Sequence, residues 1–177
     1  DMIFDSLIVQ PFYFIRKDNF DRDMKIACTL IQKYINKNHK IITFDFNGKK
    51  VLVTGASSGV GREVAILLSA MGAKVVIVAR RESELQKTLS LMEGSGHSYR
   101  VVDLADFDKV VSTIKEIVIS DGEKFDSIAH CAGMVKILPL RIINKGDIDQ
   151  IMNVNYYSFA AILKCVGSKK LFNDGGS

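Results

Sequence analysis

Apolar positions follow two alternating spacings from residue 50 onward. Short runs of consecutive apolar and β-branched residues predict buried parallel strands at 50–53, 74–79, 98–102 and 127–131. Between and after these runs, apolar residues recur every three or four positions, which predicts amphipathic helices at about 60–71, 85–92, 107–118 and 147–171. Alternating strands and helices predict an α/β fold, a doubly wound parallel sheet with helices on both faces.

Residues 1–45 carry a less regular pattern. Residues 7–15 are apolar but include Pro11, which favours an edge strand or an extended arm. Residues 24–35 have helical spacing, and 42–46 alternate as a half-buried strand would. We assign 1–45 as an N-terminal extension, either the tail of a preceding domain or an arm, and 46–177 as the domain itself.

The turn after the first predicted strand carries the candidate chemistry. Gly55 permits a tight turn, Gly59 lets the backbone approach a pyrophosphate, and Gly61 lets the following helix pack on the strand. Free N–H groups and the positive end of the helix dipole favour an anion there. The cofactor-binding residues expected in this turn are Gly55, Ser57, Ser58, Gly59, Val60 and Gly61.

This spacing, Thr54-Gly55-x3-Gly59-x-Gly61, resembles the short-chain dehydrogenase/reductase family. It differs from the commoner Gly-x-Gly-x-x-Gly fingerprint, and no lysine follows Gly61 as in the phosphate loop of ATPases. The resemblance covers about residues 46–177, within which four motifs of the family occur in order. It implies a Rossmann-type fold that binds a nicotinamide dinucleotide and is incomplete here at its C-terminus.

Arg80 and Arg81 follow the second predicted strand, where the adenosine ribose lies in a dinucleotide fold. Arginine at this place pairs with a 2′-phosphate, whereas an acidic residue would bind a 2′-hydroxyl. The alternative is that both arginines only solvate the start of a helix. With the glycine motif, they predict NADP(H) rather than NAD(H), and Arg80 is the first candidate.

Two further strand ends match the family. The resemblance implies that Asp103 and Leu104 meet the adenine, although an aspartate there could also cap the next helix. His130-Cys131-Ala132-Gly133 stands where the family shows Asn-Asn-Ala-Gly, so Cys131, Ala132 and Gly133 are expected along the cofactor. His130 and Cys131 replace the two asparagines, so the usual asparagine side-chain bonds are not expected. No partner ligands lie at metal spacing around these residues, and we predict no metal site.

Asn155 is the candidate catalytic residue. It falls within an apolar stripe of the long helix that comprises Ile148, Met152, Phe159, Ile162, Leu163 and Val166. We predict that Asn155 is buried and that its amide is hydrogen-bonded, since an unpaired buried amide costs roughly 1–3 kcal/mol. The resemblance implies that this asparagine holds the water that contacts a catalytic lysine; a satisfied core asparagine is the alternative.

The family's serine and Tyr-x3-Lys are expected beyond Ser177, because neither Tyr156 nor Tyr157 has a lysine four residues later. We expect the sequence to be part of a longer protein, with a fifth strand beginning near Ser177, and residues 1–177 alone to be inactive. The intact protein is expected to interconvert a ketone or aldehyde and an alcohol with NADP(H). The alternatives are a non-catalytic NADP(H) sensor and an extended short-chain enzyme acting on nucleotide sugars.

The composition limits the kinds of partner and the cellular location that we expect. A net charge of +4 without a lysine or arginine run gives no indication of nucleic-acid binding. Apolar runs stay far below the roughly 20 residues of a membrane span, and no signal peptide is visible. Three scattered cysteines suit reduced thiols, so we expect a cytoplasmic protein. We also expect a homo-oligomer formed through helix 147–171.

Overall fold

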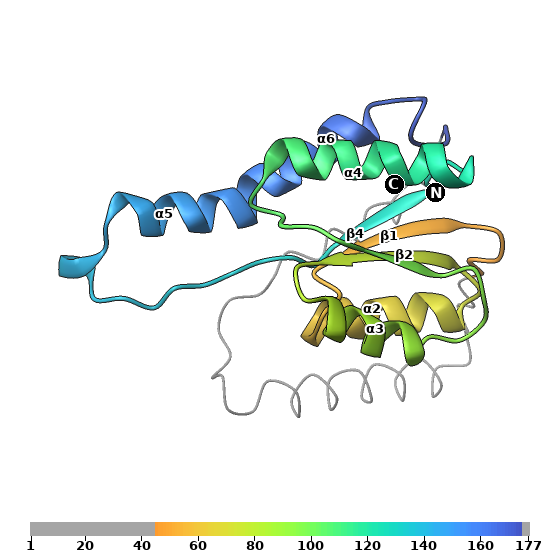
Figure 1. Ribbon diagram of the computed structural model, residues 1–177, viewed down its shortest axis with the longest axis horizontal. Helices are drawn as coiled ribbons and strands as arrows, with labels where there is room; N and C mark the ends of the chain where they lie inside the picture. The colour runs from red at the N-terminus through yellow and green to blue at the C-terminus, as the bar shows by residue number, and fades with distance from the viewer. Residues whose placement is uncertain (1–44, 175–177) are drawn as a thin grey trace, which may run out of the picture. The chain divides into compact units, whose positions relative to one another are not determined.

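The computed structural model describes residues 45–174 (Figure 1). The arm or strand predicted at 7–15 and the helix predicted at 24–35 lie outside these residues. Of the strand predicted at 42–46, the described Asp45 and Phe46 belong to no strand. The chain instead turns at Asn47-Gly48, where the Lys49 N–H donates to the Phe46 carbonyl at 2.9 Å, and then enters the sheet.

Four parallel strands form the described sheet, in the order β3-β2-β1-β4. They are β1 (Lys50–Thr54), β2 (Lys74–Ala79), β3 (Ser98–Val101) and β4 (Ser127–His130). The chain moves outward from β1 to β3 and then returns to the other side of β1. The strand order therefore reverses between β1 and β4, and the carboxyl ends of these two strands flank the crevice where doubly wound sheets bind ligands.

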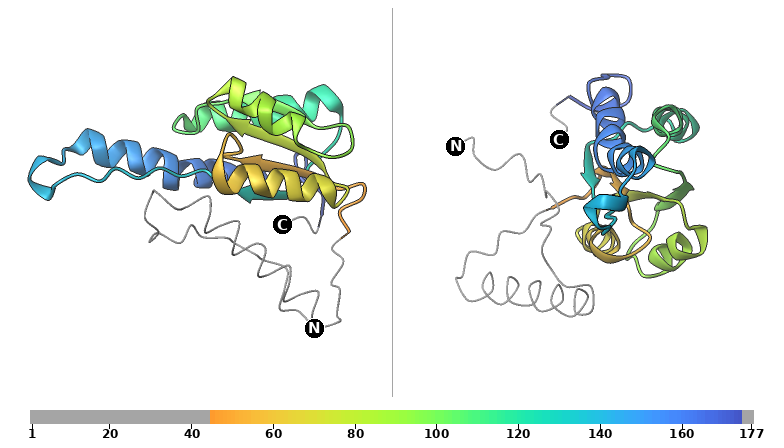
Figure 2. Two further views of the ribbon diagram at one scale, coloured as in Figure 1. Left: turned by 90° about the horizontal axis from the view of Figure 1, so that it is seen from below. Right: turned by 90° about the vertical axis from the view of Figure 1, so that its left-hand side faces the viewer.

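Helices cover both faces of the sheet, as the periodicity predicts (Figures 1 and 2). Alternate side chains of β1 point to opposite faces: Val51 and Val53 pack with the helices α2 (Gly59–Ala70) and α3 (Glu82–Ser90). Leu52 packs on the other face, with α4 (Phe107–Asp121) and α6 (Ser158–Val166). This two-sided burial explains why the two central strands, β1 and β2, are almost continuously apolar. No helix within 45–174 is both long and apolar enough to cross a membrane.

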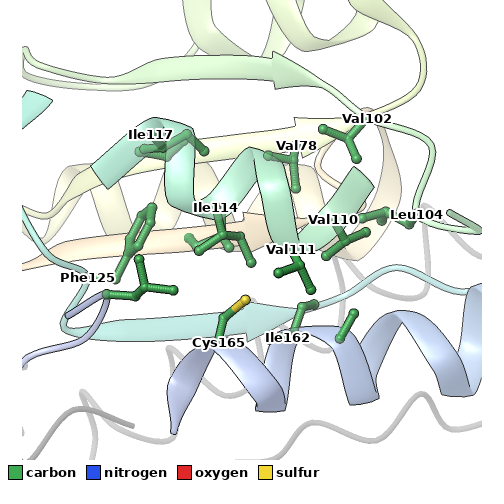
Figure 3. Packing of buried hydrophobic residues seen from close by; sticks show 14 of the residues in the cluster. Val78, Val102, Leu104, Val110, Val111, Ile114, Ile117, Phe125, Ile162 and Cys165 are labelled. Carbon is green, nitrogen blue, oxygen red and sulfur yellow. The ribbon is translucent and has the colours of Figure 1, made fainter. Parts of the chain in front are cut away.

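The α4–α6 layer closes one face through aliphatic contacts between the two helices and the sheet (Figure 3). Val110, Ile114 and Ile117 of α4 are buried against Ile162 and Cys165 of α6. Asp106 caps α4 by accepting a hydrogen bond from the Lys109 N–H at 2.9 Å, which fixes where this helix begins.

The single helix predicted at 147–171 is wrong in its bounds, since the helical run covers 145–166, and in its regularity, since it contains a π-helical turn. The chain forms the short 3-10 helix η1 (Leu140–Ile142), then α5 (Lys145–Met152), a π-helical turn η2 (Asn153–Tyr157) and α6. α5 begins two residues early because Asn144 and Asp147 form a capping box, with reciprocal bonds of 3.1 and 3.2 Å. α5 extends beyond the carboxyl ends of the strands (Figure 1).

The apolar stripe predicted for this helix also needs correction. Ile148, Met152 and Leu163 are 48%, 39% and 51% exposed. The buried face instead comprises Val154, Ser158, Ala161, Ile162 and Cys165. A π-helical turn holds more residues than an α-helical turn, so it rotates the faces of α5 and α6 relative to each other. In addition, α5 lies past the sheet, so none of the four described strands packs against its apolar side chains.

After α6 the chain returns to the segment just before β4, whereas the fifth strand predicted to begin near Ser177 lies outside the described residues. Phe172 makes a parallel bridge with Phe125, just before β4. The Phe125 N–H donates to the Leu171 carbonyl, and the Asn173 N–H donates to the Phe125 carbonyl, each at 2.9 Å. Leu171 and Phe172 are buried against the α4–α6 side of the sheet.

Adjacent residues of α6 test which face of this helix is buried. Ile162 is 1% exposed and Leu163 is 51% exposed. We expect Ile162→Ala to lower the free energy of unfolding by roughly 2–5 kcal/mol, because it leaves a cavity in the core. Leu163→Ala is the matched control and should change it by less than about 0.5 kcal/mol. Urea unfolding measures both, and equal losses would contradict the observed face.

Candidate cofactor-binding site

The glycine turn after β1 is built so closely that two positions exclude a side chain. Gly55 has a φ of 69°, and a Cβ placed there would lie 2.8 Å from the Ala132 Cα. A Cβ at position 61 would lie 2.5 Å from the Gly55 carbonyl oxygen. The turn and the close packing of helix on strand predicted for Gly55 and Gly61 are confirmed.

An unpredicted brace from α2 and α3 holds the loop between these glycines. Arg62 donates from Nη2 to the Ser57 carbonyl at 2.5 Å and to Glu84 at 2.8 Å, and from Nε to the Thr88 hydroxyl at 3.0 Å. The Thr88 hydroxyl in turn donates to the Ala56 carbonyl at 2.8 Å. Two loop carbonyls are thus occupied by side-chain donors, and the first turn of α2 contains no acidic residue. The helix start therefore suits an anion.

Glu84 supplies the counter-charge of this brace. Hydrogen bonds from Lys87 and Arg62 lower the pKa of Glu84 to about 2, so its carboxylate is ionised at neutral pH. The sequence holds one signal for the brace. Arg62 places a cation in the first turn of a helix, where the helix dipole disfavours positive charge, so an acidic partner is needed. Nothing in the spacing identifies Glu84 or Thr88 as the partners.

Arg81, rather than Arg80, lies at the glycine loop. Its Nη2 donates to the hydroxyl oxygens of Ser57 and Ser58 at 3.2 and 2.9 Å. Arg80 is exposed and makes no side-chain hydrogen bond or ion pair with the residues that the structure describes. The structure thus groups Arg81, rather than the preceding Arg80, with the two serines predicted to bind cofactor.

The carboxyl ends of β1 and β4 are joined through His130. The Thr54 hydroxyl lies 2.8 Å from Nδ1 of His130 and accepts a hydrogen bond from the Ala132 N–H at 3.3 Å. On the other side of the ring, Nε2 of His130 lies 3.4 Å from the Ser158 hydroxyl, which donates to the Val154 carbonyl at 2.5 Å. Burial alone lowers the pKa of His130 to about 4, so the ring is neutral at pH 7.

Of the other residues predicted at the strand ends, some pack in the core and one bonds to the backbone. Burial raises the pKa of the Cys131 thiol to about 11, so this thiol is protonated and packs as a small apolar group against the α2–α3 side of the sheet. Asp103 is exposed and accepts from the Ala105 N–H at 3.1 Å, while Leu104 is buried in the α4–α6 layer. Within residues 45–174, no three His, Cys, Asp or Glu side chains converge as a metal site would require.

Asn155 lies in the π-helical turn and is half-buried, less than predicted. Its amide is hydrogen-bonded to backbone, as predicted: Oδ1 accepts from the Met134 N–H at 2.8 Å, and Nδ2 donates to the Met134 carbonyl at 2.9 Å. This pair of bonds fixes the chain just after Gly133 against the helix. π-helical turns within longer helices occur frequently at functional sites.

Comparison with known proteins agrees with this arrangement. A family model described as short chain dehydrogenase matches residues 49–174. Gluconate 5-dehydrogenase of Gluconobacter oxydans is 33% identical over 114 residues, which cover 63% of this chain and 44% of that protein. The chain spans less than half the length of the first curated relatives that it matches.

Solved structures share the fold. A short-chain type dehydrogenase/reductase from Mycobacterium ulcerans superimposes with a TM-score of 0.61 at 27% identity, over 68% of this chain and 46% of that one. A Shigella flexneri protein described as a short-chain dehydrogenase, complexed with NADP, superimposes with a TM-score of 0.62 at 25% identity, over 70% of this chain and 56% of that one.

The low pKa of His130 predicts that the folded state loses stability in mild acid. The unfolded chain binds this proton near the ordinary pKa of 6.5, and the folded chain only near 4. The contribution is therefore complete above pH 6.5 and is lost as the pH falls from 6.5 to 4, with a total of about 3 kcal/mol. Asp121 and Asp126, whose pKa values lie below 3.8, act at lower pH.

Urea unfolding of the wild type and of His130→Asn between pH 7 and 4.5 measures this loss. The variant should show a flatter dependence of unfolding free energy on pH. Parallel curves for the two proteins would assign the acid sensitivity to other groups.

The paired bonds of Asn155 make the Met134 amide a local probe. We expect Asn155→Ala to speed hydrogen exchange at the Met134 N–H and to lower the free energy of unfolding by about 1 kcal/mol, since two hydrogen bonds at a half-buried site are lost. The control is Asn153→Ala, at a residue that makes no side-chain bond within 45–174. Unchanged exchange at Met134 in Asn155→Ala would show that the pair is not formed in solution.

Proposed function

The chain belongs to the short-chain dehydrogenase/reductase family, and from this premise we propose that the intact protein is an NADP(H)-dependent oxidoreductase. Its reaction is the interconversion of a ketone or aldehyde and an alcohol. The observation that carries the proposal is the glycine turn after β1 with Arg81 hydrogen-bonded to its two serines. The names of the relatives agree with the class, since gluconate 5-dehydrogenase is a dehydrogenase of a hydroxy acid.

The residues around the turn fit the diphosphate of a dinucleotide. Side chains at 55 and 61 would fill the cradle, whereas glycine leaves the backbone accessible. The brace through Arg62 and Thr88 keeps the loop carbonyls turned to protein donors, so the amide groups at the start of α2 are left for phosphate oxygens. These residues act by presenting a preformed anion site, which lowers the cost of ordering on binding.

Arg81 suits a 2′-phosphate better than a 2′-hydroxyl. Its guanidinium is held beside the Ser57 and Ser58 hydroxyls, which are further hydrogen-bond donors for a phosphate. Arg80 is exposed immediately before it and adds positive charge. The NADP complex of the Shigella flexneri relative supports the same preference. We therefore assign the phosphate contact to Arg81 first, with Arg80 as the alternative from the sequence.

The reacting end of the site lies toward the chain after β4. When bound, NADP(H) supplies or accepts the hydride. The chain's own contribution there is positional, because Asn155 fixes the Met134 backbone just after Gly133. Within 45–174 no tyrosine has a lysine four residues later, so the general acid of the proposed reaction comes from outside these residues.

Titrating the intact protein with NADPH and NADH tests the proposal. A charge-assisted hydrogen bond contributes roughly 1.5–3 kcal/mol, so Arg81→Ala should lose about tenfold to a hundredfold of NADPH affinity with little change for NADH. Arg80→Ala is the matched comparison and should lose less. The reverse ranking would return the assignment to Arg80, and equal losses of both cofactors in each variant would contradict a 2′-phosphate contact.

Turnover decides between an enzyme and a sensor. The intact protein should oxidise NADPH in the presence of a panel of small ketones and aldehydes, or reduce NADP with the corresponding alcohols. Tight NADPH binding without turnover of any member of the panel would favour the sensor.

A further inference from the structure

The hydrogen bonds around His130 admit one consistent arrangement of protons. The Ala132 N–H donates to the Thr54 oxygen, which leaves the Thr54 hydroxyl proton free to donate to Nδ1 of His130. The Ser158 hydroxyl proton is committed to the Val154 carbonyl at 2.5 Å. The Ser158 oxygen can therefore only accept from His130, so the imidazole proton lies on Nε2.

The opposite tautomer leaves two groups unmatched. With the proton on Nδ1, the Thr54 hydroxyl would have no acceptor among the described residues, and the bare Nε2 of half-buried His130 would face the Ser158 oxygen. Thr54 and Ser158 are both 0% exposed, so water cannot reach the Thr54 hydroxyl or the Ser158 oxygen. An unmade hydrogen bond of a buried group is costly, and this selects the Nε2–H form.

We propose that His130 is a positioning residue whose neutral, Nε2-protonated imidazole ties the end of β1 to the helix that carries Asn155. At one end of the link, Thr54 directly precedes Gly55 of the glycine turn. At the other end, Ser158 bonds the Val154 carbonyl, next to Asn155 in the π-helical turn. The link thus sets the separation between the two halves of the site.

An asparagine at this position can make only the first half of the link. Its amide reaches as far as the δ position, where Nδ1 of His130 lies. The imidazole presents nitrogens at both the δ and the ε positions, so it can bond Thr54 and Ser158 together. This difference lets the two ends of the link be separated experimentally.

Nitrogen-15 NMR of the histidine ring in the intact protein reads the tautomer directly. At pH 7 we expect one neutral form with the proton on Nε2, unchanged in Thr113→Val, which removes another buried threonine hydroxyl that makes no bond to His130. An Nδ1-protonated ring or an imidazolium at pH 7 would overturn the proposal. Because this measurement uses no cofactor, it stands independently of the proposed function.

Two variants then separate positioning from packing. His130→Phe, which fills the space without polar atoms, should lose about tenfold of NADPH affinity and speed hydrogen exchange at Met134. His130→Asn should restore the Thr54 bond and most of the NADPH affinity, but leave Met134 exchange fast, because Ser158 stays unlinked. Identical behaviour of the two variants, or unchanged Met134 exchange in both, would overturn the link.

Of these measurements, only the NADPH affinity rests on the proposed function. If the wild type binds neither NADPH nor NADH, the proposed function fails. The tautomer and the Met134 exchange still decide the role of His130.

Discussion

The close approach of α2 to the end of β1 is the constraint on which the site depends. The carbonyl oxygen of Gly55 occupies the space where a side chain at position 61 would begin. Because the helix starts so near the strand, Arg62 in its first turn can reach the Ser57 carbonyl, and Arg81 in the turn between β2 and α3 can reach the serine hydroxyls. A helix set farther from the strand would lose these contacts together, and the loop would no longer present its amides in one arrangement.

The apolar pattern predicts the central strands β1 and β2 well, because strands buried on both faces leave little choice of residue. β1, β2, β3 and β4 lie within one residue of their predicted ends. The helix after β4 is predicted less well, since periodicity assumes a constant turn. The π-helical turn at Asn153–Tyr157 breaks that assumption. None of the strands within 45–174 lies beneath α5, so Ile148 and Met152 are exposed although their spacing predicts core residues.

In the candidate site, features set by residues close in sequence are predicted, and contacts between residues distant in sequence are not. The roles of Gly55 and Gly61 follow from a short motif. The bonded amide of Asn155 is predicted from an apolar stripe, of which Ile148 and Met152 are exposed in the structure. The brace from Glu84 and Thr88 does not follow from the sequence, because these residues come from another helix and no spacing links them to Arg62. His130 departs from the family's asparagine, and only the geometry shows that its second nitrogen has a partner.

At the π-helical turn, the number of residues matters as well as their identity. Such a turn accommodates one residue more than an α-helical turn, so it amounts to an insertion that the helix has absorbed without unwinding. Removing one residue from 153–157 would restore a regular helix and turn α5 by about 100° about its axis relative to α6. The number of residues in 153–157 therefore sets which helix face presents Asn155 to Met134. A substitution does not change this number, whereas a deletion or an insertion does.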